Sequence, residues 1–198
     1  AMAASTEDEA LMAKHAEAID TLKAFEIMIG DDTGAYNAAM NVKRSEFAKI
    51  ALHTLGLEYL AQGNQGYSKF PDVANDHWAV GYINVAAQQG IIIGDDNGNF
   101  RPDDSITYAE ATTMLVRMLG YEPSAIAKGG YPTGYLVVGA QEGLSKNVTL
   151  GVNEPVKRAQ IAQMTFNALT DDLMEQVGFG SSASYEVVDK TILEDKLG

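Results

Sequence analysis

Short motifs recur along this chain, and their recurrence limits its fold more than any other feature. The sequence IGDD at residues 29–32 returns at residues 93–96. The sequences VKRSE, ITYAE and VKRAQ, at residues 42–46, 106–110 and 156–160, align with one another. Self-similarity of this length is typical of proteins that pack several copies of one supersecondary unit. We therefore expect three units with the same local fold.

Each unit predicts two helices joined by a glycine-containing loop. The second helix of the middle unit has the spacing of a buried apolar stripe, at Ala111, Met114, Leu115, Met118 and Leu119. First helices are expected over residues 9–28, 77–89 and 133–142. One helix pair cannot bury its apolar face alone, so the units must pack together. A compact pseudo-threefold arrangement and a short open stack both satisfy this requirement.

The predicted fold class is therefore mainly α. We place the first unit at residues 1–60, the middle unit at 61–122 and the third at 123–172. Residues 173–198 break the repeat, because GFGSS is typical of a linker and SYEVV has the β-branched character of a strand. We expect this short extension to lead toward a following domain.

The charge balance argues against two classes of partner. The chain has 27 acidic and 14 basic residues, a formal net charge of −13 at pH 7. Such a chain, without a basic cluster, is not expected to bind nucleic acid or an anionic membrane surface. No apolar run approaches the ~18 residues of a membrane-spanning helix. Cysteine is absent, which excludes disulfides, thiolate metal sites and cysteine nucleophiles.

Neither a metal site nor a catalytic site is predicted. The loop GIIIGDDNGNFRPDD at residues 90–104 resembles a calcium loop, but counted from Asp95 the required glycine is replaced by Phe100. The required bidentate glutamate is replaced by Ile106. The motifs H-E-x-x-H, G-x-S-x-G and G-x-x-x-x-G-K-[ST] are also missing. We expect a glycine-rich connection here, with no cofactor and no enzymatic activity.

The middle unit carries a specific combination of short motifs. They are FPDV at residues 70–73, HW at 77–78, GI at 90–91, GNFRP at 98–102 and ITYAE at 106–110. Together they make this segment resemble an S-layer homology repeat. With the weaker flanking copies, the resemblance covers roughly residues 9–169.

The resemblance implies both a fold and a function. Three S-layer homology repeats form a pseudo-threefold, spindle-like bundle with grooves between its lobes. Such regions hold surface proteins non-covalently on secondary cell-wall polysaccharide, often one capped by a pyruvylated amino sugar. We therefore expect an extracellular protein of the bacterial cell wall or S-layer, with this polysaccharide as its partner. The alternative is a module that binds other S-layer subunits within the surface lattice.

Basic pairs at two of the second-helix starts are the main candidate binding residues. They are Lys43 with Arg44 and Lys157 with Arg158. Cations in a first helical turn oppose the helix dipole, at about 0.3–1 kcal/mol each, so two such pairs suggest another role. An arginine can bind a carboxylate through two parallel hydrogen bonds, which suits a pyruvate ketal. Surface ion pairs with acids such as Glu46 are the alternative explanation.

Four other residues are candidates on the strength of the resemblance. Tyr108 stands where the family's T-R-A-E motif has its arginine, so we expect its groove to bind more weakly than those of the two arginines. Trp78, and Tyr131 in the equivalent place, are candidates for sugar contact, although Trp78 suits a core position equally well. Asp72 is a candidate for binding sugar hydroxyls or for capping the helix that follows.

Two isolated histidines, His15 and His53, have no motif around them. We expect both at the surface or at its boundary.

Overall fold

The computed structural model describes residues 5–198, so the first four residues of the expected first unit lie outside the described part. The fold is mainly α, as predicted. The helices are α1 (Thr6–Lys14), α2 (Ala16–Ala24), α3 (Arg44–Thr54), α4 (Val80–Gln88), α5 (Tyr108–Met118), α6 (Glu122–Ala127), α7 (Thr133–Gln141), α8 (Arg158–Leu169) and α9 (Ile192–Asp195). Short 3-10 turns lie at Glu58–Leu60, Gln62–Asn64 and Gly180–Ser182, and the strands are β1 (Met174–Val177) and β2 (Ser184–Val187). No helix within residues 5–198 is both long and apolar enough to cross a membrane.

The three predicted second helices are α3, α5 and α8, and they begin in the same way. At each start the third helical residue accepts a hydrogen bond from the backbone N–H of the capping residue. The pairs are Lys43 to Glu46 (2.7 Å), Thr107 to Glu110 (3.0 Å) and Lys157 to Gln160 (2.9 Å). This bond satisfies one backbone donor that the helix itself cannot satisfy.

A closed ring of three backbone hydrogen bonds joins the residues that precede these helices. The N–H of Val42 donates to Val156 O at 3.0 Å, that of Val156 to Ile106 O at 3.1 Å, and that of Ile106 to Val42 O at 2.8 Å. All three side chains are buried. Because the ring closes, the arrangement is the compact pseudo-threefold one and not an open stack.

The helix starts also exchange hydrogen bonds with loops distant in the sequence. The first N–H groups of a helix have no acceptor within it. The N–H of Arg44 donates to Asp104 O, that of Tyr108 to Glu154 O and that of Arg158 to Met40 O, each at 2.9 Å. Every second helix is therefore capped by the loop of another part of the chain.

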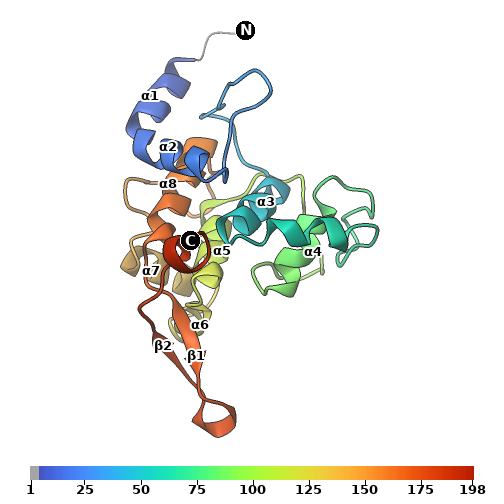
Figure 1. Cartoon of the computed structure of the whole chain (residues 1–198), viewed down its shortest axis with the longest axis vertical. Coiled ribbons are helices and arrows are strands. Elements are labelled where there is room, and N and C mark those ends of the chain that lie inside the picture. Colours follow the sequence, from blue (N-terminus) through green and yellow to red (C-terminus); the bar gives the residue numbers. More distant parts are fainter. Residues whose placement is uncertain (1–4) are drawn as a thin grey trace.

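Helices pack in pairs that also cross between the predicted units. Helix α3 packs on α4, α5 on α7, and α2 on α8, so the N-terminal helices close the arrangement against the last long one. Figure 1 shows α2 beside α8, and α3 with α4 projecting as a separate lobe. The largest side chains of the shared core, all fully buried, include Phe47, Leu52, Ile83, Phe100, Leu115 and Ile161.

The first predicted helix differs from its expected form. Residues 9–28 do not form one helix, because the chain turns at His15, with φ −113° and ψ 24°, between α1 and α2. The expectation that His15 lies at the surface or its boundary was wrong, since it is only 2% exposed. Its Nδ1 lies 2.9 Å from Oε1 of Gln163 on α8. The packing of α2 against α8 therefore buries this side chain.

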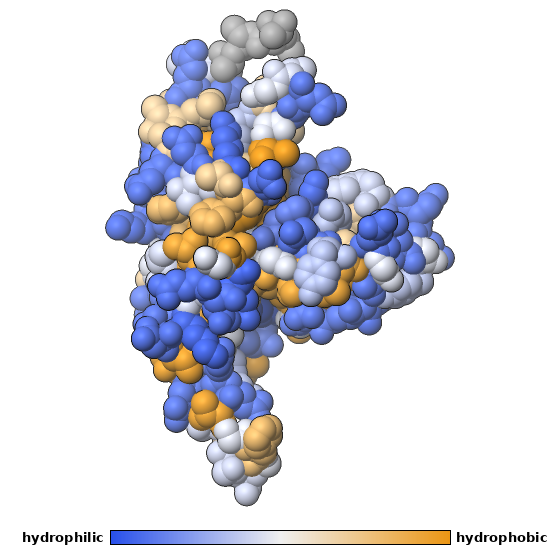
Figure 2. All heavy atoms as spheres, viewed as in Figure 1, coloured by the Kyte–Doolittle hydropathy of each residue, from blue (hydrophilic) through white to orange (hydrophobic). Residues whose placement is uncertain are grey.

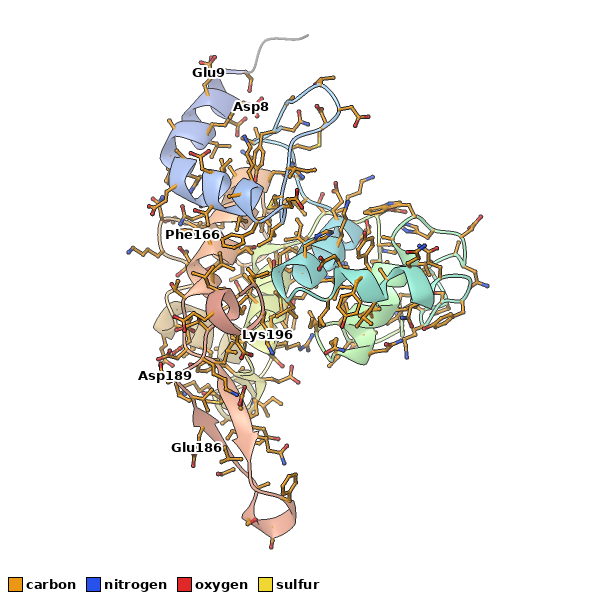
Figure 3. All side chains as sticks on the ribbon, viewed as in Figure 1. Asp8, Glu9, Phe166, Glu186, Asp189 and Lys196 are labelled. Atoms are coloured by element: carbon orange, nitrogen blue, oxygen red, sulfur yellow. The ribbon has the colours of Figure 1, made fainter. Side chains whose placement is uncertain are left out.

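Helix α1 is fastened to the loop after α2 by Asp8. The backbone N–H of Ala39 donates to Oδ1 of Asp8 at 2.8 Å, and Oδ2 of the same carboxylate accepts from Ser5. Figure 3 shows Asp8 on the side of α1 that faces this loop. These hydrogen bonds lower the pKa of Asp8, and the one from Ala39 has the largest effect.

The C-terminal extension forms a hairpin and then returns to the core. Strands β1 and β2 pair antiparallel, with Met174 opposite Val187. Leu173, before the hairpin, and Ile192, in α9 after it, are both buried. The hairpin projects from the body in Figure 1, and most of the face seen in Figure 2 is hydrophilic, with apolar side chains gathered near its middle.

The ring of hydrogen bonds predicts a large effect of substitution at its centre. Ile106→Ala should lower the free energy of unfolding by about 2–5 kcal/mol, because a fully buried side chain leaves a cavity. Urea unfolding followed by circular dichroism measures this value. The matched control Ile93→Ala, 58% exposed, should change it by less than ~0.5 kcal/mol. Equal losses of unfolding free energy for the two substitutions would contradict tight packing of Ile106 at the pseudo-threefold axis.

A carboxyl cluster at the base of the extension makes stability depend on pH. Burial, then the charge and hydrogen bond of Glu142 and the charge of Asp172, raise the pKa of Asp171 to about 7 from 3.8. The folded state therefore holds a proton that the unfolded state releases, so stability falls as pH rises. The hydroxyl of neighbouring Tyr121 donates to Asp172 O at 2.7 Å.

The pH dependence can be tested with Asp171→Asn. Between about pH 4 and 7 the wild type should lose about 1–2 kcal/mol relative to this variant, after allowance for solvent screening of a half-buried carboxyl. Urea unfolding at several pH values measures the difference. Parallel stability curves for the two proteins over this range would refute the shift.

Candidate functional site

A groove of about 330 Å³ lies where three parts of the chain meet. It is lined by Arg44 at the start of α3, by residues 92–96 and Arg101 of the loop between α4 and α5, by Glu110, Thr113, Met114 and Arg117 of α5, and by Tyr131 before α7. We call it the Arg44 groove. Two of the residues predicted from the sequence, Arg44 and Tyr131, come together in it.

Arg44 is fixed within this groove by other side chains and by the backbone. Its Nη1 lies 2.5 Å from Oε2 of Glu110, and its Nε donates to Phe100 O at 2.7 Å. The guanidinium also lies over the ring of Phe100, 4.9 Å from its centroid. Arg44 is only 7% exposed, so water can do little to stabilise its charge. The carboxylate of Glu110 balances that charge inside the protein.

Arg101 is the second cation that binds Glu110. Its Nη2 lies 2.6 Å from the same Oε2 atom, and Asp104 and Asp95 lie 3.2 and 3.4 Å from its other nitrogens. The backbone of Arg101 has φ 59°, a left-handed conformation that non-glycine residues rarely adopt. The adjacent loop therefore directs this side chain back toward α5.

Asp72 stabilises this unusual loop. Its Oδ1 accepts the N–H of Phe100 at 2.9 Å, and its Oδ2 accepts that of Arg101 at 2.7 Å. The rings of Phe70 and Phe100 pack with centroids 5.5 Å apart. The hydrogen bonds of Asp72 hold the loop before α5 and do not cap the helix that follows Asp72. Binding of sugar hydroxyls by Asp72 stays a prediction. Asp72 does not line the Arg44 groove.

The ion pairs change the acid–base properties of the groove. Burial alone would raise the pKa of Glu110, but the charge of Arg44 and the hydrogen bonds from Thr107 and Arg101 outweigh it and lower the pKa. Burial also lowers the pKa of Arg44, an effect that Glu110 opposes. Burial, then the charge of Glu110, raises the pKa of Tyr131. Glu110 is therefore a carboxylate at neutral pH, and the groove contains a fixed negative charge.

Arg158 makes equivalent backbone contacts but has no acidic partner. Its Nε donates to Tyr36 O at 2.8 Å, and its Nη2 donates to Ile29 O at 2.9 Å. Its guanidinium lies 5.0 Å from the ring centroid of Tyr36. Among residues 5–198 no carboxylate lies within ion-pair distance of Arg158, which is half-buried. Arg158 therefore carries a positive charge that other described side chains leave uncompensated.

The remaining predicted residues occupy varied environments. Trp78 and Tyr131 are 54% and 58% exposed, so Trp78 is not a core residue. Tyr108 is half-buried and packs against the core. Lys157 pairs with Glu7 of α1, in agreement with the ion-pair alternative, whereas Lys43 is exposed and makes no ion pair among residues 5–198.

A second groove, of about 420 Å³, lies between α2 and α8 and is rich in amides. Oε1 of Gln163 lies 2.9 Å from His15 Nδ1 and accepts from Asn147 Nδ2 at 3.3 Å. Gln163 in turn donates to Asn167, whose Nδ2 donates to Leu144 O and Lys146 O. We call this the amide groove, and its lining contains neither arginine nor tyrosine.

The acidic loops have a structural role that accounts for their composition. Oδ1 of Asp95 accepts the N–H groups of Asn97 and Asn99, each at 2.9 Å. In the equivalent loop after α2, hydrogen bonds lower the pKa of Asp31 to about 2. The largest effect is that of the Thr33 hydroxyl, and the next is that of the Asn37 side chain. Within residues 5–198 no three acidic or histidine side chains are arranged to hold a metal ion.

Sequence reasoning missed three charged residues of the Arg44 groove. In the sequence, Arg101 stands out only as part of the GNFRP motif and Glu110 only as part of the ITYAE motif. Arg117 pairs with Glu122 and lies over the ring of Tyr135, 5.4 Å from its centroid. The i, i+3, i+7 spacing of Glu110, Thr113 and Arg117 on α5 was the available signal, since it places them on one face.

Comparison with known proteins identifies related sequences over most of the chain. The family model for the S-layer homology domain matches residues 12–48 and 69–112. The chain is 35% identical to the Middle cell wall protein of Brevibacillus brevis over 96% of its own length and 18% of that protein. It is 35% identical to the Surface layer protein of Brevibacillus choshinensis, covering 88% of the chain and 15% of the relative.

A third relative is the Cell surface protein of Thermoanaerobacter kivui, 31% identical over 83% of the chain and 21% of that protein. The chain therefore spans only 15 to 21% of the length of these curated relatives.

The two arginines should contribute differently to stability. Arg44→Ala should lower the free energy of unfolding by about 3 kcal/mol, because it leaves the nearly buried Glu110 with one cation fewer. Arg158→Ala should cost about 1 kcal/mol, the usual value for lost hydrogen bonds to backbone carbonyls. Urea unfolding of both variants measures the difference. A larger loss for Arg158→Ala would contradict the assignment of the paired and unpaired cations.

Proposed function

Because this chain belongs to the S-layer homology family, we propose that it anchors a surface protein by binding secondary cell-wall polysaccharide in grooves between its units. The family match and the cell-wall and surface-layer relatives support cell-surface anchoring and an extracellular, wall-associated location. The anchored protein would be longer than this chain, as its relatives are. This role needs binding and no catalytic step.

The single observation that supports an acidic sugar as ligand is the uncompensated Arg158. Its guanidinium has one terminal nitrogen, Nη1, that donates to no group among residues 5–198. Its two backbone hydrogen bonds hold the group in place, so little side-chain entropy is lost on binding. A carboxylate, such as that of a pyruvate ketal on an amino sugar, is a suitable partner for this cation. The chain's net charge of −13 makes a local positive site the more necessary for such a ligand.

The pseudo-threefold arrangement supports Trp78 as the aromatic residue of the proposed site at Arg158. We propose three units at the boundaries given above, with Arg158 and Trp78 repeating the relation of Arg44 to Tyr131. The Nε atoms of both arginines donate to equivalent loop carbonyls, those of Tyr36 and Phe100. Trp78 is exposed and its ring packs on His77, with centroids 5.9 Å apart. An exposed indole that a neighbouring ring holds in place can pack against the apolar face of a sugar.

One observation favours the alternative of assembly with other S-layer subunits. The C-terminal hairpin exposes Phe179, Tyr185 and Val187, at 89%, 53% and 55%. Exposed apolar side chains on a projecting element are typical of a contact surface. This surface is separate from Arg158 in the sequence, so wall binding and lattice assembly can be tested independently.

Wall binding can be tested by sedimentation with purified bacterial sacculi, before and after chemical removal of their secondary polysaccharide. The wild type should sediment with intact sacculi only, and Arg158→Ala should weaken binding at least about tenfold, because it removes the carboxylate partner. Lys190→Ala is the matched control: it removes a half-exposed cation between β2 and α9 and should bind as the wild type does. The proposal would be contradicted if the wild type bound stripped sacculi as well as intact ones, or if Arg158→Ala bound intact sacculi as well as the wild type does.

A further inference from the structure

Glu110 is the centre of the charge arrangement in the Arg44 groove. Its Oε2 receives Nη1 of Arg44 at 2.5 Å and Nη2 of Arg101 at 2.6 Å, two guanidiniums from different parts of the chain. Its Oε1 accepts the N–H of Thr107 at 3.0 Å. The carboxylate of Glu110 thus occupies the position that a ligand carboxylate would take between two arginines.

We propose that Glu110 is a resident carboxylate that excludes acidic sugars from the Arg44 groove, and that this groove binds an uncharged sugar unit instead. The inference rests on the proposed function, because it assigns a different sugar class to a second groove of the same wall-binding region. On this view the protein binds two kinds of sugar unit in one polysaccharide, an acidic one at Arg158 and an uncharged one at Arg44.

The charges around the groove support the exclusion. The lining contains three cations, Arg44, Arg101 and Arg117, and three acids, Asp95, Asp96 and Glu110. An entering carboxylate would have to displace Glu110 from both arginines. The displaced carboxylate, whose side chain is 10% exposed, would then be left unpaired in a poorly solvated place. Binding of an anion is therefore opposed by desolvation as well as by repulsion.

The rest of the lining supports an uncharged sugar. Tyr131 presents an exposed ring, and the exposed Ile93 adds apolar surface to the same lining. Asp96 is exposed and makes no hydrogen bond or ion pair through its side chain among residues 5–198, so it is free to accept a sugar hydroxyl. Apolar walls with a few polar groups are typical of a small-ligand site.

The Arg158 side of the molecule lacks both parts of this arrangement. The residue equivalent to Arg101 is Asn37, which has the same left-handed backbone, φ 58°, but no charge. The residue equivalent to Glu110 is Glu46, whose Oε1 accepts the N–H of Lys43 and which makes no ion pair with Arg158. An external carboxylate therefore meets Arg158 without competing with a resident one.

Another helix of the same chain shows that glutamine can replace Glu110 without loss of the helix cap. Helix α8 has Gln160 at the position of Glu110, and Oε1 of Gln160 accepts the N–H of Lys157 at 2.9 Å. Glutamine thus keeps the helix cap. Glu110→Gln should remove the resident negative charge while leaving the start of α5 intact, and it should free Arg44 and Arg101 for an external anion.

The test uses calorimetric titration with two probes, a hexosamine glycoside that carries a pyruvate ketal and the same glycoside without it. In an Arg158→Ala background, where the first acidic site is removed, adding Glu110→Gln should strengthen binding of the acidic probe at least about tenfold. Adding Arg44→Ala to that double variant should abolish the gain. Folding of each variant is confirmed by urea unfolding. The inference is overturned if folded Glu110→Gln protein shows no gain, or if Arg158→Ala alone already binds the acidic probe through Arg44.

Tyr131→Ala provides a second test that leaves the ion pairs in place. It should weaken binding of the uncharged probe at least about tenfold and leave the acidic probe unaffected. Unchanged binding of the uncharged probe would overturn the assignment of this groove. If the wild type binds sacculi through Arg158 but these probes show no difference, only this inference fails. If Arg158→Ala does not affect binding to sacculi, the proposed function itself fails.

Discussion

The fold depends on the closed ring of hydrogen bonds among Val42, Ile106 and Val156. Each of these residues donates its N–H to one of the others and accepts at its carbonyl, so three buried backbone segments satisfy one another. The next residues begin helices whose first N–H groups are capped by loops from elsewhere in the chain. None of the three helix starts is complete without the other two. This mutual dependence explains why the chain closes on itself rather than extending as a stack.

The grooves are a consequence of the same closure. A surface such as the Arg44 groove combines one helix start, the loop and helix of a second segment, and an aromatic residue of a third. The three helix starts share equivalent backbone hydrogen bonds, but the side chains around them differ. At the first, Glu110 pairs with both Arg44 and Arg101. At the third, Arg158 makes no ion pair among residues 5–198, and a groove beside α8 is lined by amides such as Asn147 and Gln163. A threefold scaffold can therefore carry a different set of side chains at each helix start.

Local patterns in the sequence predicted the second helices well, because each combines an apolar stripe with an acceptor three residues past its cap. The same reasoning predicted a glycine-rich connection at Asp95, and the carboxylate of Asp95 holds this loop through the N–H groups of Asn97 and Asn99. It wrongly placed His15 at the surface or its boundary, because the packing of α2 on α8, which buries this side chain, joins residues far apart in the sequence. It treated Arg44 and Arg158 as equivalent for the same reason: the pairing of Arg44 with Glu110 arises only when two distant helix starts meet. The sequence of the tail predicted the strand β2 but neither its partner β1 nor the return of α9 to the core.

The fluorescence of Trp78, the only tryptophan of the chain, gives the most direct test of wall-polysaccharide binding beside Arg158. Its indole is half exposed, so a sugar that covers it changes both the intensity and the wavelength of emission. Titration with secondary polysaccharide released from sacculi should give a saturable change that Arg158→Ala abolishes. A tryptophan signal that does not respond to polysaccharide which the protein demonstrably binds, or that responds equally in Arg158→Ala, would contradict the account.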